Sequence, residues 1–563
     1  MPPGETTSPK IFGFSEFIGT LALMVLVWTL ADVKYRFRVA VASGTLYLTT
    51  FALMAAIGVL SLLTEVWRAQ GWWVPRMAGL SYALWQMILG MLFFVTFLTW
   101  MWYAFIRPPV YGRRNAKRYV HQLYRVTLKG SPTELPVIAD ELSRSAKTLI
   151  HYASDRGEFK NDKEEGAATD DSKKKNKVPE VTGFADDILL LIADKKFCRY
   201  IVKSSPITAL AFFQEIGSTK KYGVPIEIFA KNITNEALEN KDSFLFHESE
   251  GYHSGLIGYH KPLSQAMYAN YKMVEAIGTL LDPDISGKIK WGALQWEAYC
   301  RIVLMTFRNY VEHGHGGHSF VLYRAQGYIE HAVFDLYKIN GMVAGTWDDE
   351  VRHRLGVVVR FLKDAIRILN EKGSPRYVEL RVRDDHRVSS VYDNIAKMIF
   401  EVMFAASAVR APRDLCWWIQ HNSVWGEVFN FSNRDGVASK IIHFKVRRLL
   451  YNEIVDMSRF PNFKGAKILG FVLNVLGLRF RKEKYFRDSN ALHKAVLSWT
   501  RRNYAWLYTY NPRVAEACLV DGITYDQANL RLVQTYPAEG LRREAAYVYL
   551  ELDPPSLSSG VKD

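Results

Sequence analysis

The sequence predicts a membrane-anchored, mainly α-helical protein: three N-terminal transmembrane helices, then a large, mostly helical cytoplasmic domain with few short strands. Three observations lead to this prediction. Long apolar runs occupy 11–31, 39–63 and 77–106. Basic residues gather beside these runs on one side. The remaining chain is more polar, and its apolar residues recur mostly at helical spacing.

Each apolar run is long enough to cross a bilayer, because about 20 apolar residues span the roughly 30 Å hydrocarbon core. The second and third runs contain no Asp, Glu, Lys, Arg or His, and the first contains only Glu16. The third run would be about 45 Å long as a helix, so we expect it to tilt or to extend past the headgroups. The alternative is a buried hairpin of a soluble protein, but core helices rarely reach 18 uncharged residues.

The first run is expected to stay in the mature chain. It is longer than the apolar part of a signal peptide, and only Lys10 precedes it. It ends at Trp28-Thr29-Leu30-Ala31-Asp32, which is not a small-residue cleavage pattern. We therefore expect a transmembrane span instead of a cleaved leader.

Positive charges predict the orientation, because short basic loops stay on the cytoplasmic side. The loop after the first run contains Lys34, Arg36 and Arg38. The third run is followed by a basic collar that consists of Arg107, Arg113, Arg114, Lys117 and Arg118. Three spans then place the N-terminus outside and the C-terminal domain in the cytoplasm, beneath a plasma (inner) membrane. We expect the basic collar to contact anionic lipid.

The composition supports the same domain organisation. The sequence predicts a three-helix transmembrane domain at 1–106, a basic juxtamembrane helix region with a charged flexible linker at 107–180, and a mainly helical cytoplasmic domain at 181–563 that could divide near 372–386. The net charge of +15 over 563 residues suits an anionic membrane surface. Because the charge is concentrated beside the spans, the lipid bilayer is the expected partner and nucleic acid is not.

Four isolated cysteines exclude common zinc and redox motifs. They form no CxxC pair, so a zinc ribbon and a thioredoxin-like motif are ruled out, and we expect small buried side chains. They are Cys198, Cys300, Cys416 and Cys518.

Helical periodicity and capping signals predict most elements of the domain. The first helix would open at a capping box of Ser131 and Glu134, and the last at a capping box of Thr524 and Gln527. The segment 243–246 is predicted as a short strand or extended segment, and 377–383 as a strand from its alternation of apolar and charged residues. The predicted helices are 131–152, 186–202, 206–216, 226–238, 262–281, 291–312, 320–339, 348–369, 388–408, 437–457, 491–508 and 525–535.

The segment 468–478 has two interpretations. It is apolar except for Asn474, and basic residues stand on both sides of it. A buried core helix that is followed by basic residues explains this pattern, and so does a segment that lies in the headgroup region. It is too short to span a bilayer.

The common nucleotide-binding and hydrolase motifs are missing from the chain, including GxxxxGK[ST], GxGxxG, GxSxG and HExxH. One weaker candidate is the loop with His313, His315 and His318, where three imidazoles could bind a divalent metal. A polar turn between two helices explains the same residues.

A second candidate is His247-Glu248-Ser249-Glu250 together with His253 and His260, where two carboxylates and three imidazoles could form a divalent metal site or an acid and base pair. A surface loop with charge pairs is the alternative. The third candidate is Asp384 and Asp385 with the neighbouring His386, where ordinary helix capping is the alternative.

Glu16 is the one candidate for an ion or proton path, because an acidic group in a span suggests function. It stands only about five residues into the first run, so it could also reach the headgroup region.

These observations favour a signalling or membrane-effector component that senses, binds or assembles, and that works as a homo-oligomer with protein partners. No cofactor is firmly implied. A metal-dependent hydrolase that uses the histidine loops is one alternative. The other is a subunit of a transport or channel complex with Glu16 in its path.

Overall fold

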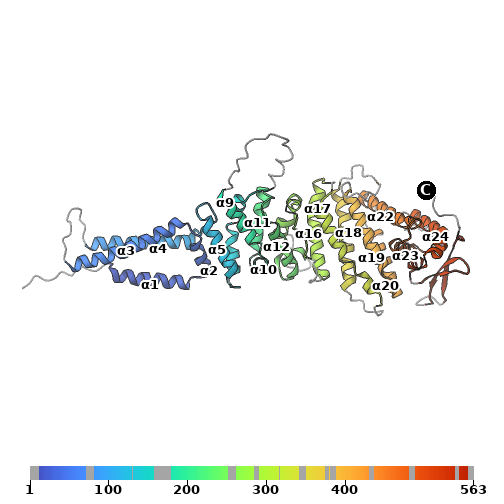
Figure 1. Cartoon of the computed structure of the whole chain (residues 1–563), viewed down its shortest axis with the longest axis horizontal. Helices are drawn as coiled ribbons and strands as arrows, with labels where there is room; N and C mark the ends of the chain where they lie inside the picture. The colour runs from blue at the N-terminus through green and yellow to red at the C-terminus, as the bar shows by residue number, and fades with distance from the viewer. Residues whose placement is uncertain are drawn as a thin grey trace, which may run out of the picture. The chain divides into compact units, whose positions relative to one another are not determined.

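The computed structural model describes residues 12–70, 82–129, 131–156, 179–250, 261–284, 291–315, 318–341, 350–373, 380, 389–429, 436–480, 489–520, 522–538 and 544–555. The described chain is mostly helical, with one small sheet near its C-terminal end (Figure 1). It divides into two compact units, Met1–Ala237 and Leu238–Asp563. The predicted boundaries near 106 and 180 both lie inside the first unit, and the suggested division near 372–386 lies inside the second.

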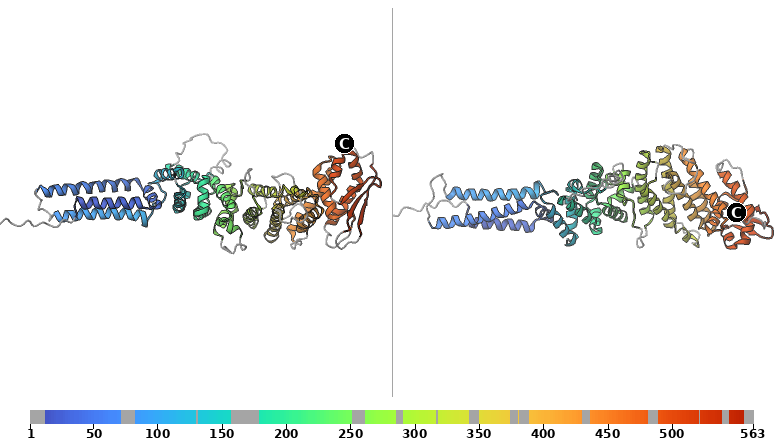
Figure 2. Two further views of the ribbon diagram at one scale, coloured as in Figure 1. Left: turned by 90° about the horizontal axis from the view of Figure 1, so that it is seen from below. Right: turned by 45° about the horizontal axis from the view of Figure 1, so that its top comes forward.

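The first unit begins with three long apolar helices, which run side by side in Figure 2. They are α1 (Phe14–Leu30), α3 (Gly44–Ala69) and α4 (Tyr82–Met101), the last continued by a π-helical turn (Trp102–Ile106). Two helical stretches, Gly44–Ala69 and Ala83–Ile106, are long and apolar enough to cross a membrane. Helix α1 gives a third candidate only together with the short α2 (Val33–Ala40), which bends away from it by 111°.

The predicted second span is shifted in the structure. Residues 39–40 belong to α2, and α3 begins only at Gly44. Helix α3 then continues past Leu63 through Glu65 and Arg68, because a helix can carry charged residues where it leaves the apolar layer. The connection between the first two runs is therefore a helix with its own packing face.

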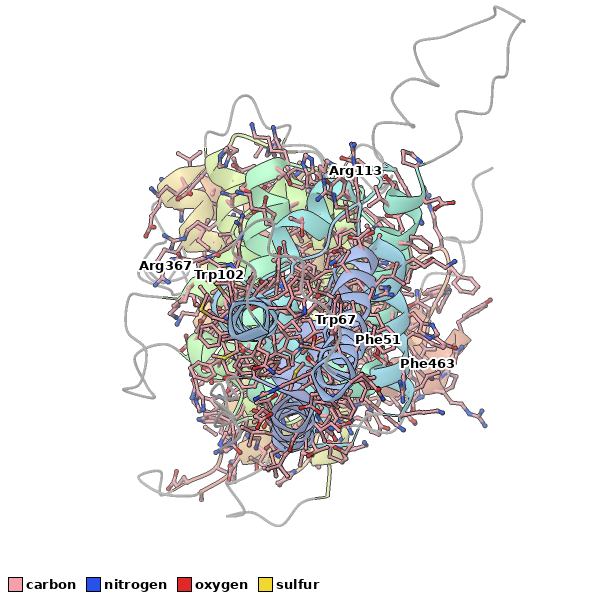
Figure 3. All side chains as sticks on the ribbon, turned by 90° about the vertical axis from the view of Figure 1, so that its left-hand side faces the viewer. Phe51, Trp67, Trp102, Arg113, Arg367 and Phe463 are labelled. Atoms are coloured by element: carbon pink, nitrogen blue, oxygen red, sulfur yellow. The ribbon has the colours of Figure 1, made fainter. Side chains whose placement is uncertain are left out.

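The three helices pack through a small aromatic core. Phe17, Ile57 and Phe93 are buried together, and the rings of Phe17 and Phe93 meet edge to face at 5.9 Å. A Cβ at Gly58 would come within 2.8 Å of the Phe17 ring, so glycine permits this close approach of α1 and α3. Other large apolar side chains stay exposed, among them Phe51, which is labelled in Figure 3.

The rest of the first unit is a set of shorter helices. The predicted helix 131–152 breaks into two at Arg144 and Ser145. The buried Ser145 hydroxyl there accepts hydrogen bonds from the backbone N of Tyr111 and from the hydroxyl of Tyr119. The helices are α5 (Ala116–Lys129), α6 (Glu134–Ser143), α7 (Ala146–Tyr152), α9 (Glu180–Leu191), α10 (Lys195–Ser204), α11 (Pro206–Thr219) and α12 (Glu227–Glu239), which crosses into the second unit.

The second unit is also built from helices. Helix α16 packs against α18, and α19 packs against α22 and α23. The helices are α13 (Phe244–Glu250), α14 (Pro262–Tyr268), α15 (Tyr271–Ile277), α16 (Ala293–Glu312), α17 (Phe320–His331), α18 (Glu350–Lys372), α19 (Val391–Ser407), α20 (Arg413–Trp417), α21 (Glu427–Phe429), α22 (Val437–Asp456), α23 (Phe463–Leu476), α24 (Asn490–Tyr510) and α25 (Pro512–Ala517), with a 3₁₀ turn at Leu336–Ile339 and a π-helical segment at Trp418–Gly426.

The predicted helix 525–535 is wrong, and a three-stranded antiparallel sheet stands there. Its order is β1 (Ile523–Asp526), β2 (Arg531–Tyr536) and β3 (Ala546–Glu551). The Asp526 carboxylate accepts hydrogen bonds from the backbone and side chain of Asn529, which closes a turn where the capping box was expected.

Three other predicted boundaries in this unit need correction. The predicted strand 243–246 is the start of α13, because the Ser243 hydroxyl accepts a hydrogen bond from Phe246 N and caps the helix. The predicted helix 262–281 is interrupted where Asn270 caps α15 through Met273 N. The predicted helix 320–339 ends at His331, before a turn and the 3₁₀ segment.

The segment 468–478 lies mostly in α23 and is a core helix. Residues Ile468, Leu469, Phe471 and Val472 each have no exposed surface. The buried Asn474 amide donates to Gln420 Oε1 at 2.9 Å, so its polar group is satisfied inside the protein. The headgroup alternative for this segment is therefore wrong.

All four cysteines are buried and unpaired with one another, as the sequence predicted. The predicted strand 377–383 lies outside the described residues except for Leu380, which is a bend.

Candidate functional site

The most distinctive polar site of the first unit is a buried ion pair beside the apolar helices. Lys34 and Arg38 stand one helical turn apart on α2, so they share a face. That face packs against α6, which presents Glu141. Arg38 and Glu141 are each only 5% exposed. We call this pair and its neighbours the Arg38–Glu141 joint.

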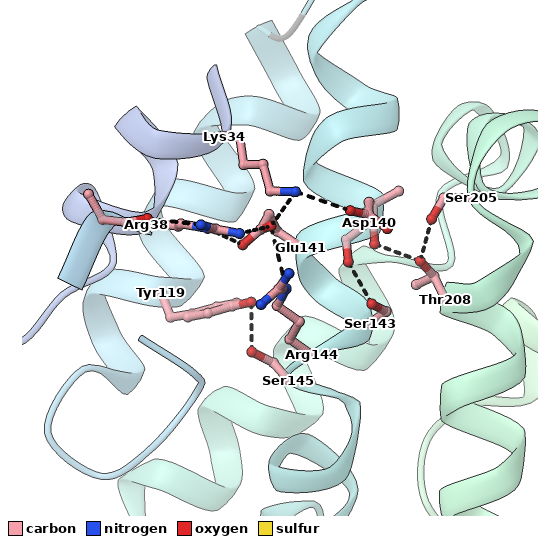
Figure 4. Close-up of polar contacts among 12 residues, drawn as sticks. Lys34, Arg38, Tyr119, Asp140, Glu141, Ser143, Arg144, Ser145, Ser205 and Thr208 are labelled. Carbon is pink, nitrogen blue, oxygen red and sulfur yellow. Dashed lines mark hydrogen bonds and ion pairs between the residues drawn. The ribbon is translucent and has the colours of Figure 1, made fainter. Parts of the chain in front are cut away.

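The geometry of the pair is bidentate. Arg38 Nε donates to Glu141 Oε2 and Arg38 Nη2 donates to Glu141 Oε1, both at 2.7 Å (Figure 4). Lys34 Nζ lies 3.3 Å from Oε1 of the same carboxylate, and Arg144 Nε lies 3.6 Å from it. Parallel hydrogen bonds from a guanidinium fix both distance and orientation.

The electrostatics keep Glu141 ionised. Burial by itself would raise the pKa of this carboxyl, but the hydrogen bonds from Arg38, together with the charges of Arg38, Arg144 and Lys34, hold the pKa below its ordinary value. A carboxylate saturated by cations in this way is a poor proton donor or acceptor. The joint is therefore suited to fastening helices together, and not to acid–base catalysis.

The joint connects three segments that are distant in sequence. The remaining Arg38 donor, Nη1, reaches the carbonyl oxygen of Ala104 at 2.8 Å, inside the π-helical turn that ends α4. A π turn frees backbone groups from the regular helical pattern, which leaves this carbonyl ready to accept. One guanidinium thus ties α2, the end of α4 and α6 together.

A second polar contact supports the joint. The buried Asn115 donates from Nδ2 to the carbonyls of Val41 and Val110, and its Oδ1 accepts from Gly112 N. This amide holds the residue after α2 against the loop that follows the last apolar helix. All three hydrogen-bond partners of the Asn115 side chain are backbone groups, so the contact depends on the path of the backbone.

The sequence pattern does not reveal the joint. In the sequence Arg38 is one of the basic residues that predict the orientation, and Glu141 lies within the predicted helix 131–152 with no assigned role. One available signal was the position of Glu141, which follows Ile138 by three residues and precedes Leu142, both fully buried. An acid on the apolar face of a helix requires a buried partner.

The predicted lipid contacts of the basic collar all lie on the surface. Arg118 stacks on Tyr47 with its guanidinium carbon 5.5 Å from the ring centre, and Arg113 lies 6.0 Å from the ring centre of Tyr152. The exposed members are Arg107, Arg113, Arg114, Lys117 and Arg118. Lipid contact stays a prediction.

Glu16 caps the beginning of its own helix. Its carboxylate accepts from Gly13 N at 2.9 Å, and Glu65 of α3 accepts from Phe14 N at 3.0 Å. Carboxylates at a helix N-terminus satisfy free amides and complement the helix dipole. This local role explains the position of Glu16 at one end of the bundle.

The first histidine loop makes surface contacts. His313 is exposed and donates from Nδ1 to the carbonyl oxygen of Asn309, and His318 is exposed beside Tyr323. His315 packs against Tyr271 and Tyr310. These aromatic contacts match the interpretation as a polar turn.

The second histidine cluster is only partly described. His247 is half-buried on α13, while His253 and the side chain of Glu250 lie outside the described residues, as do Asp384 and Asp385. Within the described part of the chain, no three His, Cys, Asp or Glu side chains form a group that could hold a metal ion.

The second unit contains a carboxyl group with an unusual pKa. Burial of Glu330 on α17, and then the charge of Glu401 on α19, raise its pKa to about 7, against a smaller opposing effect of Lys464. Lys464 Nζ pairs with Glu401 Oε1 at 2.9 Å. Burial also raises the pKa of Glu453 on α22.

We expect Glu330→Gln to change the pH dependence of stability. The pKa of Glu330 in the folded chain, about 7, exceeds its ordinary value of 4.5, so the folded chain binds more protons in this interval. Stability is then lost as the pH rises from about 4.5 to about 7. The variant should gain on the order of 1 to 2 kcal/mol over the wild type at pH 8 and little at pH 4.5, after allowance for solvent screening.

Thermal unfolding of the full chain in mild detergent at both pH values measures this effect. Glu516→Gln, at an exposed position of α25, is the control. An equal shift of the melting temperature at the two pH values would contradict the interpretation.

Comparison with known proteins found no match: no family model, no curated protein and no solved structure is significantly similar to this chain.

Proposed function

We propose that this chain is an integral protein of the plasma (inner) membrane whose helical cytoplasmic domain senses or assembles as a signalling or membrane-effector component. The observation that carries the proposal is the Arg38–Glu141 joint. It lies where α1 and α4 end, and it fastens α2 and the end of α4 to α6. A tether that only anchored the chain would need no such rigid connection.

The apolar surface of the three helices supports insertion. Side chains that would be costly in water stand exposed along them, and lipid would cover them. Examples are Leu23, Leu30, Leu48, Phe51, Met91 and Phe94.

Charge supports the orientation. The basic collar follows α4, and Lys34, Arg36 and Arg38 lie between α1 and α3. Because short basic segments are retained in the cytoplasm, the end of the bundle with the joint faces inward. The rest of the chain then lies in the cytoplasm, where homo-oligomerisation would let it transmit a signal or assemble a complex. A monomer in mild detergent would contradict this part of the proposal.

Cysteine labelling tests the insertion and the orientation together. We expect Gln70→Cys, at the end of α3, to react with a membrane-impermeant maleimide in intact spheroplasts. Glu516→Cys should react only after permeabilisation. Both positions are exposed, and the four native cysteines are buried, so the background should be low.

Alkaline carbonate extraction of the same membranes provides the second measurement. The chain should stay in the pellet with integral proteins. Release into the supernatant would overturn membrane insertion, and labelling of Glu516→Cys in intact spheroplasts would overturn the orientation alone.

A further inference from the structure

Two adjoining hollows lie on the first unit where the apolar helices meet α5. One is a groove of about 700 Å³ along the bundle, and the other is a cavity of about 920 Å³ beside α5. Trp28, Val39 and Tyr47 line both. The two hollows are therefore continuous, and these three shared side chains lie where one meets the other.

The groove along the bundle is apolar. Its walls come mainly from α1 and α3, and it extends from Leu46 to Leu62 along α3. Met24 and Val25 of α1 and Trp100 of α4 complete it. A surface of this kind, at the level of the spans, matches a hydrocarbon chain and not a polar ligand.

Basic side chains line the cavity beside α5. Lys117, Arg118 and His121 of α5 line it. His121 follows Lys117 by four residues and Arg118 by three, so it is a helical neighbour of both. Among the described residues, no carboxylate lies within ion-pairing distance of Lys117 or Arg118. These two positive charges are therefore available to an external anion.

Arg118 is held in place at the mouth of the cavity. Its guanidinium stacks on Tyr47, and a Cβ at Gly44 would lie 3.4 Å from it. The guanidinium therefore lies in van der Waals reach of the start of α3. A cation fixed by stacking loses less freedom when it binds a ligand than a mobile one does.

We propose that these hollows bind one molecule of an anionic phospholipid, with its phosphate at Lys117 and Arg118 and an acyl chain in the groove. The proposal rests on the membrane insertion proposed above. An anionic headgroup joined to an apolar tail is the ligand whose chemistry matches a cationic cavity that continues into an apolar groove. Inner-leaflet phospholipids would present this headgroup at the level of the basic collar.

Native mass spectrometry of the full chain, released from nanodiscs of phosphatidylglycerol and phosphatidylcholine, tests the charge requirement. The wild type should retain one phosphatidylglycerol, and Lys117→Gln/Arg118→Gln should bind it about 10- to 30-fold more weakly. Arg113→Gln/Arg114→Gln removes the same charge outside the lining of the cavity, and should retain the lipid. Equal loss in both double variants would show diffuse attraction and overturn the site.

Filling the groove tests the acyl-chain contact with all charges intact. Ala55 lines the groove and is exposed, whereas the neighbouring Ala56 is exposed and lies outside it. Ala55→Phe should reduce retained phosphatidylglycerol at least fivefold, and Ala56→Phe should not. Equal retention in these two variants, or equal retention of phosphatidylcholine by the wild type, would also overturn the proposal.

Fractionation separates failure of this inference from failure of the proposed function. If the chain leaves the membrane in carbonate, membrane insertion itself is wrong. If it stays in the membrane but shows no lipid selectivity, only the phospholipid site is wrong.

Discussion

Glu141→Leu is expected to destabilise the first unit by about 3 to 5 kcal/mol, because it leaves the Arg38 guanidinium buried without its carboxylate. Arg38 is 5% exposed, and two of its three hydrogen-bonding nitrogens donate to Glu141. Lys34 and Arg144 lie near the same carboxylate, so three cations would then repel one another without it. Hydrogen exchange of α2 and α6 peptides in the detergent-solubilised full chain measures the loss region by region.

Two variants make this result specific to the joint. Arg38→Met/Glu141→Leu removes both charges and should recover most of the stability, since a buried pair replaced by apolar groups is often neutral. Asp140→Asn removes a carboxylate that is half exposed and 3.6 Å from Lys34, so it should cost less than about 1 kcal/mol. A Glu141→Leu effect no larger than that of Asp140→Asn would refute the structural importance of the joint.

Lys445→Met should destabilise the second unit by a similar amount, about 3 to 5 kcal/mol. Lys445 pairs with Asp393 in the core between α22 and α19, where their side chains are 1% and 2% exposed. Asp393 also accepts hydrogen bonds from the backbone N and the hydroxyl of Ser390, so it holds the start of α19. Faster exchange of α19 and α22 amides is the expected readout.

The surface lysine Lys372 provides the matched control for this variant. It lies 3.5 Å from Glu312, and the two side chains are 47% and 35% exposed. Lys372→Met should therefore change the free energy of unfolding by less than about 1 kcal/mol. Adding Asp393→Asn to Lys445→Met should restore part of the loss, and its failure to do so would mean that the charge of Asp393 is not what destabilises the variant.

The helices were predicted well where the pattern involves only residues that are close together in the sequence. The apolar runs became α1, α3 and α4, and helical periodicity located α16, α18 and α22 within a few residues. The four buried cysteines were also expected from their spacing. These features follow from the order of neighbouring side chains, which a single sequence displays directly.

Turn chemistry caused the clearest error. Between Asp526 and Leu530 the chain reverses, with Leu530 at a positive φ of 45°, and the strands on either side pair with each other. The alternation in β2 places Leu532 inside, fully buried. A capping-box pattern and an Asp-initiated turn share residue types, so only strand pairing distinguishes them.

The candidate sites were harder to predict than the helices. The sequence located the histidine loops and Glu16, but Glu16 caps its own helix, and His315 and His318 contact tyrosine rings. The sites that the structure reveals use residues that looked ordinary. Glu141 meets a partner 103 positions away, and Arg118 stacks on a tyrosine of another helix.

By itself the sequence determined the helical class, the apolar N-terminal runs and the charge beside them, since each depends on residues within a few turns. Only the tertiary structure decided that α2 is a packing element, that α23 is buried, and that Arg38 meets Glu141. The physical reason is that a buried charge or an apolar face selects its partner by proximity in the folded chain, and that proximity comes from the packing of all the helices together.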